Sequence, residues 1–165
     1  MSRPSAADVR ALLHYDPETG VFRWREWRGG TAHTGTIAGS IDSHGHRQIR
    51  IFGDLYMAHQ LAWFYVTGEW PSEGLDHRDG ERDNNRFANL RPATKAQNCR
   101  NRRRNANNKS GFKGVYFHVR IGRYAAQIRH NRVARHLGYF DTPEAAHAAY
   151  CRASAELHQE FGRVV

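Results

Sequence analysis

The spacing of apolar positions changes along the chain, and each spacing predicts a different element. In residues 1–56, short alternating runs at Val21–Trp24 and Arg47–Ile51 predict strands, and a further strand is expected at Thr36–Ala38. A short amphipathic helix is expected over Ala6–Leu13. This part of the chain is therefore predicted to form a small β-rich module.

Residues 57–70 change to helical spacing. Apolar side chains recur at i, i+3, i+4, i+7 and i+8, at Ala58, Leu61, Ala62, Tyr65 and Val66. Gly68 ends the predicted helix, and Pro71 prevents its continuation. One face of this helix is expected to be buried.

A strand, a polar loop, a second strand and a helix are predicted in residues 75–103. The first strand is Leu75–His77, and the loop of residues 78–86 is rich in Asp, Asn and Gly. Asn89–Ala93 returns as the second strand. Thr94 is a suitable N-cap for a helix over Lys95–Arg103.

Strand spacing returns after a polar linker. Residues 100–111 lack apolar anchors, and three strand-like runs follow at Gly114–Val119, Arg123–Arg129 and Ala134–Phe140. Thr142 and Pro143 then mark the start of a helix. The apolar stripe of this helix consists of Ala146, Ala149, Tyr150, Ala153 and Leu157. A three-stranded sheet covered by one helix is the smallest arrangement that buries such a stripe.

Composition narrows the class of protein. The 165 residues include 39% hydrophobic and 12% aromatic residues, enough for a packed core. No apolar run approaches the roughly 18 residues that span a bilayer, and the N-terminal segment lacks a signal-peptide core, so a cytoplasmic protein without membrane partners is expected. Two cysteines, Cys99 and Cys151, exclude a disulfide framework and a four-cysteine zinc site.

Charge is concentrated in one part of the sequence. Lys and Arg total 25 against 16 Asp and Glu, a formal net charge of +9. The 57 residues from Asn84 to Phe140 contain 14 bases and no acid. A solvated face is the ordinary explanation of a charge run, but an unbroken run of this length favours phosphate binding.

The histidines before residue 84 do not indicate a metal site. His33, His44 and His46 lie in predicted loops without a fixed ligand spacing, and are interpreted as ordinary polar residues. His59, near the start of the predicted helix, is interpreted as structural or phosphate-facing rather than catalytic.

The strand–loop–strand–helix order of residues 75–103 resembles the HNH (His-Me finger) nucleases. Asp76-His77, Asn89 and Asn98 match the family pattern in its His-Asn-Asn form, over about 30 residues. The match extends to some 45 residues when the helix from Met57 to Trp70 is included, as in phage HNH proteins. The resemblance implies a ββα-metal catalytic unit.

The residue types suit phosphodiester hydrolysis, which needs an attacking water, a base and positive charge near the leaving oxygen. His77 is expected to be the base, and the resemblance implies that Asn89 braces the loop and orients it. Asp76 and Asn98 supply the oxygen ligands that a hard ion such as Mg²⁺ or Mn²⁺ takes. No cysteine pairs are present for the structural zinc of some relatives.

Residues 111–161 resemble the plant ethylene-response-factor (APETALA-type) DNA-binding domain. The matching stretches are Gly114-Val115, Tyr124–Arg129, Leu137–Phe140 and Ala145–Tyr150. That family lays its sheet into the major groove. The resemblance implies these groove-facing candidates: Tyr116, His118, Arg120, Arg123, Gln127, Arg129 and His136.

This second resemblance has departures. Tyr116 and His118 stand where the plant proteins carry arginine, and His136 stands where they carry tryptophan. The plant target sequence is therefore not expected to apply. Phosphate contacts are expected from the linker arginines, Arg100, Arg102, Arg103 and Arg104.

Together the patterns predict an α+β protein with a ββα-metal HNH unit and a three-stranded antiparallel sheet packed on one helix. Expected domains are 1–56 (β-rich module), 57–105 (nuclease unit) and 106–165 (DNA-binding domain). The expected function is a metal-dependent endonuclease acting on double-stranded DNA, of homing type or phage-associated. The alternatives are a DNA-binding regulator or decoy that keeps the HNH shape without cutting, and an RNA-directed protein. The oligomeric state stays open, a monomer included.

Overall fold

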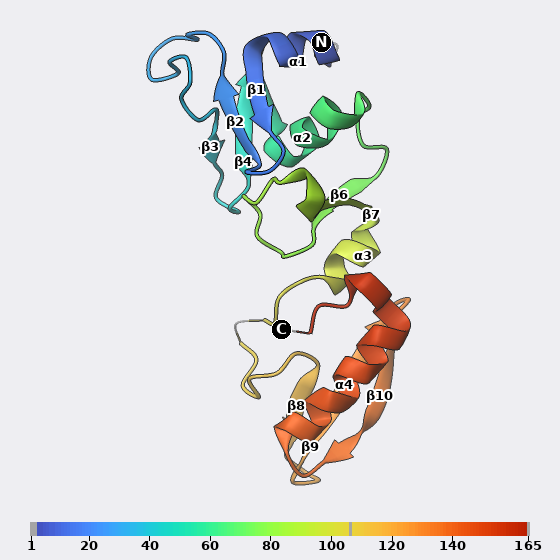
Figure 1. Cartoon of the computed structure of the whole chain (residues 1–165). Helices are drawn as coiled ribbons and strands as arrows, with labels where there is room; N and C mark the ends of the chain where they lie inside the picture. Colours follow the sequence, from blue (N-terminus) through green and yellow to red (C-terminus); the bar gives the residue numbers. More distant parts are fainter. Residues whose placement is uncertain (1–2, 106, 165) are drawn as a thin grey trace. The chain divides into compact units, whose positions relative to one another are not determined.

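The computed structural model describes residues 3–105 and 107–164, which form two compact units, Met1–Thr94 and Lys95–Val165 (Figure 1). The mixture of helices and sheets confirms the α+β class. The N-terminal unit contains these elements: α1 (Ala6–Leu12), β1 (Leu13–Asp16), β2 (Val21–Trp24), β3 (Ser40–Ile41), β4 (Arg47–Ile51), β5 (Asp54–Met57), α2 (Ala58–Thr67), β6 (Gly74–His77), the 3₁₀ turn η1 (Phe87–Asn89) and β7 (Leu90–Ala93). The C-terminal unit contains these: α3 (Lys95–Arg100), β8 (Val115–His118), β9 (Arg123–His130), β10 (Val133–Phe140), α4 (Pro143–His158) and the 3₁₀ turn η2 (Gln159–Phe161).

Residues 1–56 share one hydrophobic core with residues 57–94, although a separate module was expected there. The antiparallel hairpin β1–β2 and the antiparallel sheet β3–β4–β5 are too small to bury their apolar faces alone. Helix α2 supplies the missing surface through Ala58, Leu61 and Ala62, all fully buried, and packs against α1 and β4. The N-terminal segment and the first part of the nuclease-like segment therefore form one folding unit.

Two predicted elements differ from the structure by more than one residue at an end. The strand expected at Thr36–Ala38 is reduced to a single bridge between Ile37 and Arg23, and the strand proper is β3. Helix α3 ends at Arg100 rather than at Arg103. There the Lys113 ammonium donates to the carbonyl oxygens of Arg100 (2.8 Å) and Arg102 (2.6 Å), which satisfies acceptors at the end of the helix and stops it.

The C-terminal unit is a three-stranded antiparallel sheet in the order β10–β9–β8, with α4 packed on one face (Figure 1). Thr142 caps α4, its side chain accepting from the backbone N–H of Ala145. Ala126 and Ile128 of β9 point at α4 and pack with its Ala146 and Tyr150. Because strand side chains alternate, the intervening residues of β9 project from the opposite face of the sheet.

Candidate active site

The hairpin β6–β7 places Asp76 and His77 at the end of a strand, before the loop of residues 78–86. Asp76 pairs across the hairpin with Arg91, whose Nε and Nη2 donate to Asp76 Oδ2 at 2.9 and 2.8 Å. Both side chains are buried. The ion pair satisfies the negative charge of Asp76 and fixes the strand register immediately beside His77.

His77 is buried and held by Asn85, with Nε2 3.2 Å from Asn85 Oδ1. Asn85 donates its Nδ2 to the carbonyl oxygen of Asp83, so Oδ1 is the atom that faces the imidazole and accepts from Nε2–H. In that tautomer the lone pair of His77 is on Nδ1. Burial lowers the pKa of His77 below its usual 6.5, the Asn85 hydrogen bond acting in the opposite direction, and this keeps the ring neutral at physiological pH.

Asn89 ties the loop of residues 78–86 together. Its Nδ2 donates to Asp79 Oδ1 (3.0 Å) and to the carbonyl oxygen of Asn84 (2.8 Å), while its Oδ1 accepts from the backbone N–H of Asp79 (3.1 Å). The Asn89 carbonyl accepts from the backbone N–H of Arg78 at 2.9 Å. These bonds connect the two ends of the loop that begins directly after His77.

The N-terminal hairpin supports the same loop. Tyr15 donates its hydroxyl to the Asn85 carbonyl at 2.7 Å, and the Pro17 carbonyl accepts from the backbone N–H of Phe87 at 3.1 Å. A Cβ at Gly20 would lie 2.5 Å from the Asn85 carbonyl carbon and 2.4 Å from the next backbone nitrogen. Residues 15–20 thus position Asn85, a role that sequence reasoning missed because hairpin and loop are far apart in the chain.

Two further histidines lie beside His77. One ring nitrogen from each of His46, His59 and His77 lies within 4.8 Å of the other two. His46 precedes β4, His59 is in the first turn of α2, and His77 ends β6. Burial, with smaller contributions from His77 and His46, lowers the pKa of His59 to about 3, and burial also lowers that of His46. No fixed spacing in the sequence indicates this cluster.

The two residues expected to hold a hard metal ion belong to different units. Asp76 lies in the N-terminal unit with Oδ2 bonded to Arg91, and Asn98 lies on α3 in the C-terminal unit. A carboxylate and an amide oxygen fit the ligand preference of Mg²⁺ or Mn²⁺.

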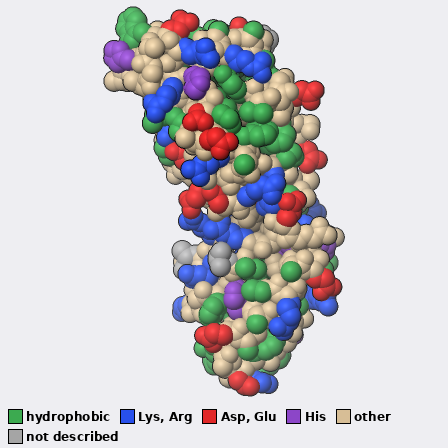
Figure 2. Space-filling view, viewed as in Figure 1, with side chains coloured by type: hydrophobic (Ala, Val, Ile, Leu, Met, Phe, Trp, Pro, Cys, Tyr) green, Lys and Arg blue, Asp and Glu red, His purple; other side chains and the backbone are tan. Residues whose placement is uncertain are grey.

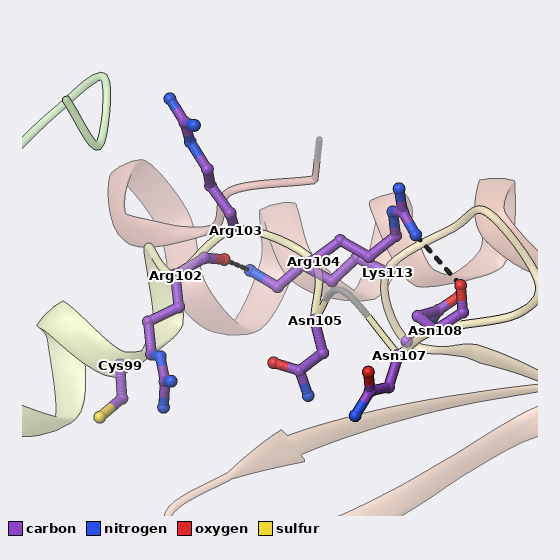
Figure 3. Close-up of a pocket in the computed structure, with 9 residues that line it drawn as sticks. Cys99, Arg102, Arg103, Arg104, Asn105, Asn107, Asn108 and Lys113 are labelled. Carbon is purple, nitrogen blue, oxygen red and sulfur yellow. Dashed lines mark hydrogen bonds between the residues drawn. The ribbon is translucent and has the colours of Figure 1, made fainter.

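Three of the linker arginines, Arg102, Arg103 and Arg104, border a pocket of about 450 Å³ within the C-terminal unit (Figure 3). Arg102, Arg103 and Arg104 are exposed, and their side chains point in different directions around it. Arg104 donates to the Asn108 carbonyl at 3.1 Å, and Arg100 donates to Asn131 Oδ1 at 3.2 Å. The linker was expected to contact DNA phosphates, with no contacts to the rest of the chain specified. In the structure, Lys113 anchors it by donating to three backbone carbonyls, the third being that of Arg163 at 2.8 Å.

Most of the groove-facing candidates lie on the face of the sheet away from α4. Cross-strand pairing places Gln127 beside His136, and His118 beside Arg123. His118 and His136 both contact Tyr139, with ring centroids 5.4 and 4.5 Å from it. The set on this face is Tyr116, His118, Arg123, Gln127, Arg129 and His136, whereas Arg120 lies in the turn between β8 and β9.

Basic and acidic side chains lie close to one another on the surface. On the face seen in Figure 2, Lys and Arg side chains are mixed with carboxylates over both units. In the sheet, Arg123 is engaged by Asp141 at 2.8 Å, but both side chains are exposed. An exposed ion pair contributes little to stability.

Comparison with known proteins gives one match. A family described as HNH endonuclease matches residues 56–100, which include α2, β6, β7 and α3. This match supports the HNH resemblance, indicates a nuclease-type function with DNA as substrate, and agrees with use of a divalent metal. No curated protein and no solved structure gives a significant match to the chain. Among the described helices, none combines the length and apolar character needed to cross a bilayer.

Proposed function

We propose that the protein is a metal-dependent HNH endonuclease that hydrolyses phosphodiester bonds of double-stranded DNA, with His77 as the general base. One observation carries the proposal. His77 is buried, neutral and oriented by Asn85 within the segment that matches the nuclease family. A neutral, oriented imidazole is the group needed to take a proton from water.

Several residues of the chain have separate roles in the proposed hydrolysis. His77 accepts the water proton on Nδ1, while Asn85 holds Nε2–H and keeps the ring in that tautomer. Asn89 closes the loop that follows His77. The Tyr15 hydroxyl donates to the backbone carbonyl of Asn85 and so helps to hold Asn85 in place. A hard divalent ion, for which Asp76 and Asn98 are the proposed ligands, supplies charge stabilisation at the leaving oxygen when bound.

We further propose that the C-terminal unit reads DNA with the sheet face away from α4. Its exposed arginines, amide and aromatic side chains are groups that bond base edges or pack on them. The linker arginines would contact phosphates without regard to sequence. A homing or phage-associated role is the corresponding biological proposal.

Cleavage of supercoiled plasmid, with Mg²⁺ and with chelator, tests the proposed activity. His77→Ala should reduce the cutting rate by roughly a hundredfold or more while DNA affinity by gel shift stays near wild type. Asp76→Ala and Asn98→Ala should raise the Mg²⁺ concentration needed for half-maximal rate. Retention of the wild-type rate in His77→Ala would remove His77 as the base. Tight DNA binding without cutting under any divalent ion would instead support a non-cleaving regulator or decoy.

A further inference from the structure

Four aromatic rings form a continuous strip on the sheet face away from α4. Tyr116 and His118 lie on β8, and His136 and Tyr139 lie on β10. Ring centroids are 6.5 Å apart for Tyr116 and His118, 5.4 Å for His118 and Tyr139, and 4.5 Å for His136 and Tyr139. These four residues are termed the aromatic strip. Because β8 and β10 are the two outer strands, the strip crosses the whole sheet.

A β-bulge in β10 brings two of these rings together. His136 and Tyr139 are three residues apart, so regular alternation would place their side chains on opposite faces of the sheet. The register shifts between His136 and Gly138, where φ of the glycine is 130°. His136 therefore pairs with Gln127, and Tyr139 with Ala125, two residues of β9 that face away from α4. The bulge thus adds a fourth ring to the strip.

Much of the aromatic strip remains exposed to solvent. Ala125 pairs with Tyr116 on one side and with Tyr139 on the other, and the rings leave it fully buried. Tyr116 is nevertheless 43% exposed and Tyr139 36% exposed. His136 is exposed as well. Covering Ala125 therefore uses only part of the ring surface, and the rest is accessible to a ligand.

Positive charge borders the aromatic strip. Arg123 and Arg129 of β9 are exposed on the same face of the sheet. None of the residues in β8, β9 and β10 is acidic. Asp141, which pairs with Arg123, follows β10 and is itself exposed. Flat rings beside cationic side chains complement a ligand that combines flat bases with phosphates, which is a nucleic acid.

Stacking on side-chain rings requires bases whose faces are uncovered. In a B-DNA duplex the faces of the bases cover one another, and the grooves present only base edges, which are read by hydrogen bonds. Unpaired bases expose their faces, and aromatic side chains stack on them with little regard to sequence. Sheets that carry such rings take about two or three bases. The aromatic strip therefore favours unpaired bases over an intact duplex.

We propose that the aromatic strip binds unpaired bases of DNA, so that the C-terminal unit prefers single-stranded or gapped DNA to an intact duplex. The rings stack on the bases, while Arg123 and Arg129 neutralise neighbouring phosphates. The choice of DNA rather than RNA rests on the proposed function. The substrate class of the nuclease is then double-stranded DNA that is interrupted by unpaired bases.

Binding is tested on the full chain with chelator present, so that no DNA is cut. Fluorescence anisotropy compares a labelled single strand, the same strand in an intact duplex, and that duplex with a short gap. The dissociation constant should be about tenfold lower for the single strand and the gapped duplex than for the intact duplex. Phosphate contacts alone would favour the intact duplex, which has more phosphates than the gapped one. Equal or tighter binding of the intact duplex would overturn the proposal, and tighter binding of an RNA strand of the same sequence would overturn DNA as the ligand.

Substitutions distinguish ring stacking from hydrogen bonding. Tyr116→Leu and Tyr139→Leu remove a ring, and each should raise the dissociation constant for the gapped duplex by roughly tenfold. Tyr116→Phe and Tyr139→Phe keep the ring and should bind within about twofold of the wild type. Phe117→Leu is the matched control, because Phe117 is 50% exposed but contacts Tyr124 on the α4 side of the sheet. Circular dichroism melting verifies folding. Equal losses in the control and in the two tyrosine-to-leucine variants would overturn the role of the strip.

Cleavage in Mg²⁺ distinguishes this proposal from the proposed function. The gapped duplex should be cut faster than the intact duplex, and Tyr139→Leu should reduce the difference. A preference for gapped DNA in a protein that cuts no DNA would refute the nuclease and leave the aromatic strip as a binding surface. Equal affinity and equal cutting rate for gapped and intact duplexes would refute the role of the strip and leave the nuclease.

Discussion

Asn85 accepts a hydrogen bond from His77 at 3.2 Å, and both side chains are buried. Asn85→Ala removes the acceptor that sets the tautomer of His77, and the cutting rate should fall by roughly tenfold or more without loss of DNA affinity. Single-turnover cleavage and gel shift measure the two effects, with circular dichroism melting to verify folding. Equal losses of rate and affinity would mean that Asn85 acts on the fold rather than on His77.

Asn85→Asp should change the pH dependence of cutting. A carboxylate beside Nε2–H raises the pKa of His77, which burial now holds below its usual 6.5. Because the base must be neutral to accept a proton, the acid limb of the rate profile should move to higher pH. The measurement is the single-turnover rate from about pH 5 to 9. An unmoved acid limb would show that a group other than His77 controls it.

Gly20→Ala should destabilise the N-terminal unit and lower the cutting rate. The new Cβ would lie within 2.5 Å of the backbone at Asn85, at a residue with φ of 75°. Gly53→Ala is the matched control, since φ there is 94° and no atom lies within 4 Å of the added Cβ. Gly53→Ala should lower the free energy of unfolding by about 1 kcal/mol, and Gly20→Ala should lower it by about 1–3 kcal/mol more. Urea unfolding followed by tryptophan fluorescence measures both values. Similar costs in both variants would argue against the hairpin contact.

Lys113→Met should destabilise the C-terminal unit by about 2 kcal/mol, because three backbone carbonyls lose a charged donor. Lys109→Met, at an exposed lysine, should have little effect. All four tryptophans lie before residue 71, so circular dichroism rather than fluorescence follows the affected unit. Equal stability of the two variants would show that the anchor contributes nothing.

The sheet and the linker should affect DNA binding differently. Gln127→Ala or Arg129→Ala should weaken the free energy of DNA binding by roughly 1–3 kcal/mol on the preferred sequence and by less on other sequences. Arg152→Ala changes an exposed residue of α4 and is the control, which should leave the sequence preference unchanged. Arg102→Ala or Arg103→Ala should weaken binding on all sequences and make the salt dependence shallower by about 0.9 for each phosphate that the variant no longer neutralises. Site selection followed by salt titration distinguishes the two classes. An unchanged sequence preference in both sheet variants would show that base recognition takes place elsewhere in the chain.

Local sequence determined most of the secondary structure. The strands Val21–Trp24 and Arg47–Ile51 have the predicted bounds, and Thr142 caps α4 as expected. These features depend on the periodicity of apolar side chains and on backbone hydrogen bonds between near neighbours. The motif around His77 was also visible in the sequence, because its residue types and spacing lie within one short segment.

Contacts between distant segments were decided only by the tertiary structure. No sequence pattern joins Tyr15 to Asn85, or His46 and His59 to His77, because neither set has a characteristic spacing. Residues 1–56 have a strand-like pattern that indicates a module, yet their small sheets need α2 to cover their apolar faces. Burial then sets the chemistry, because exclusion of water lowers the pKa of His59 and of His77.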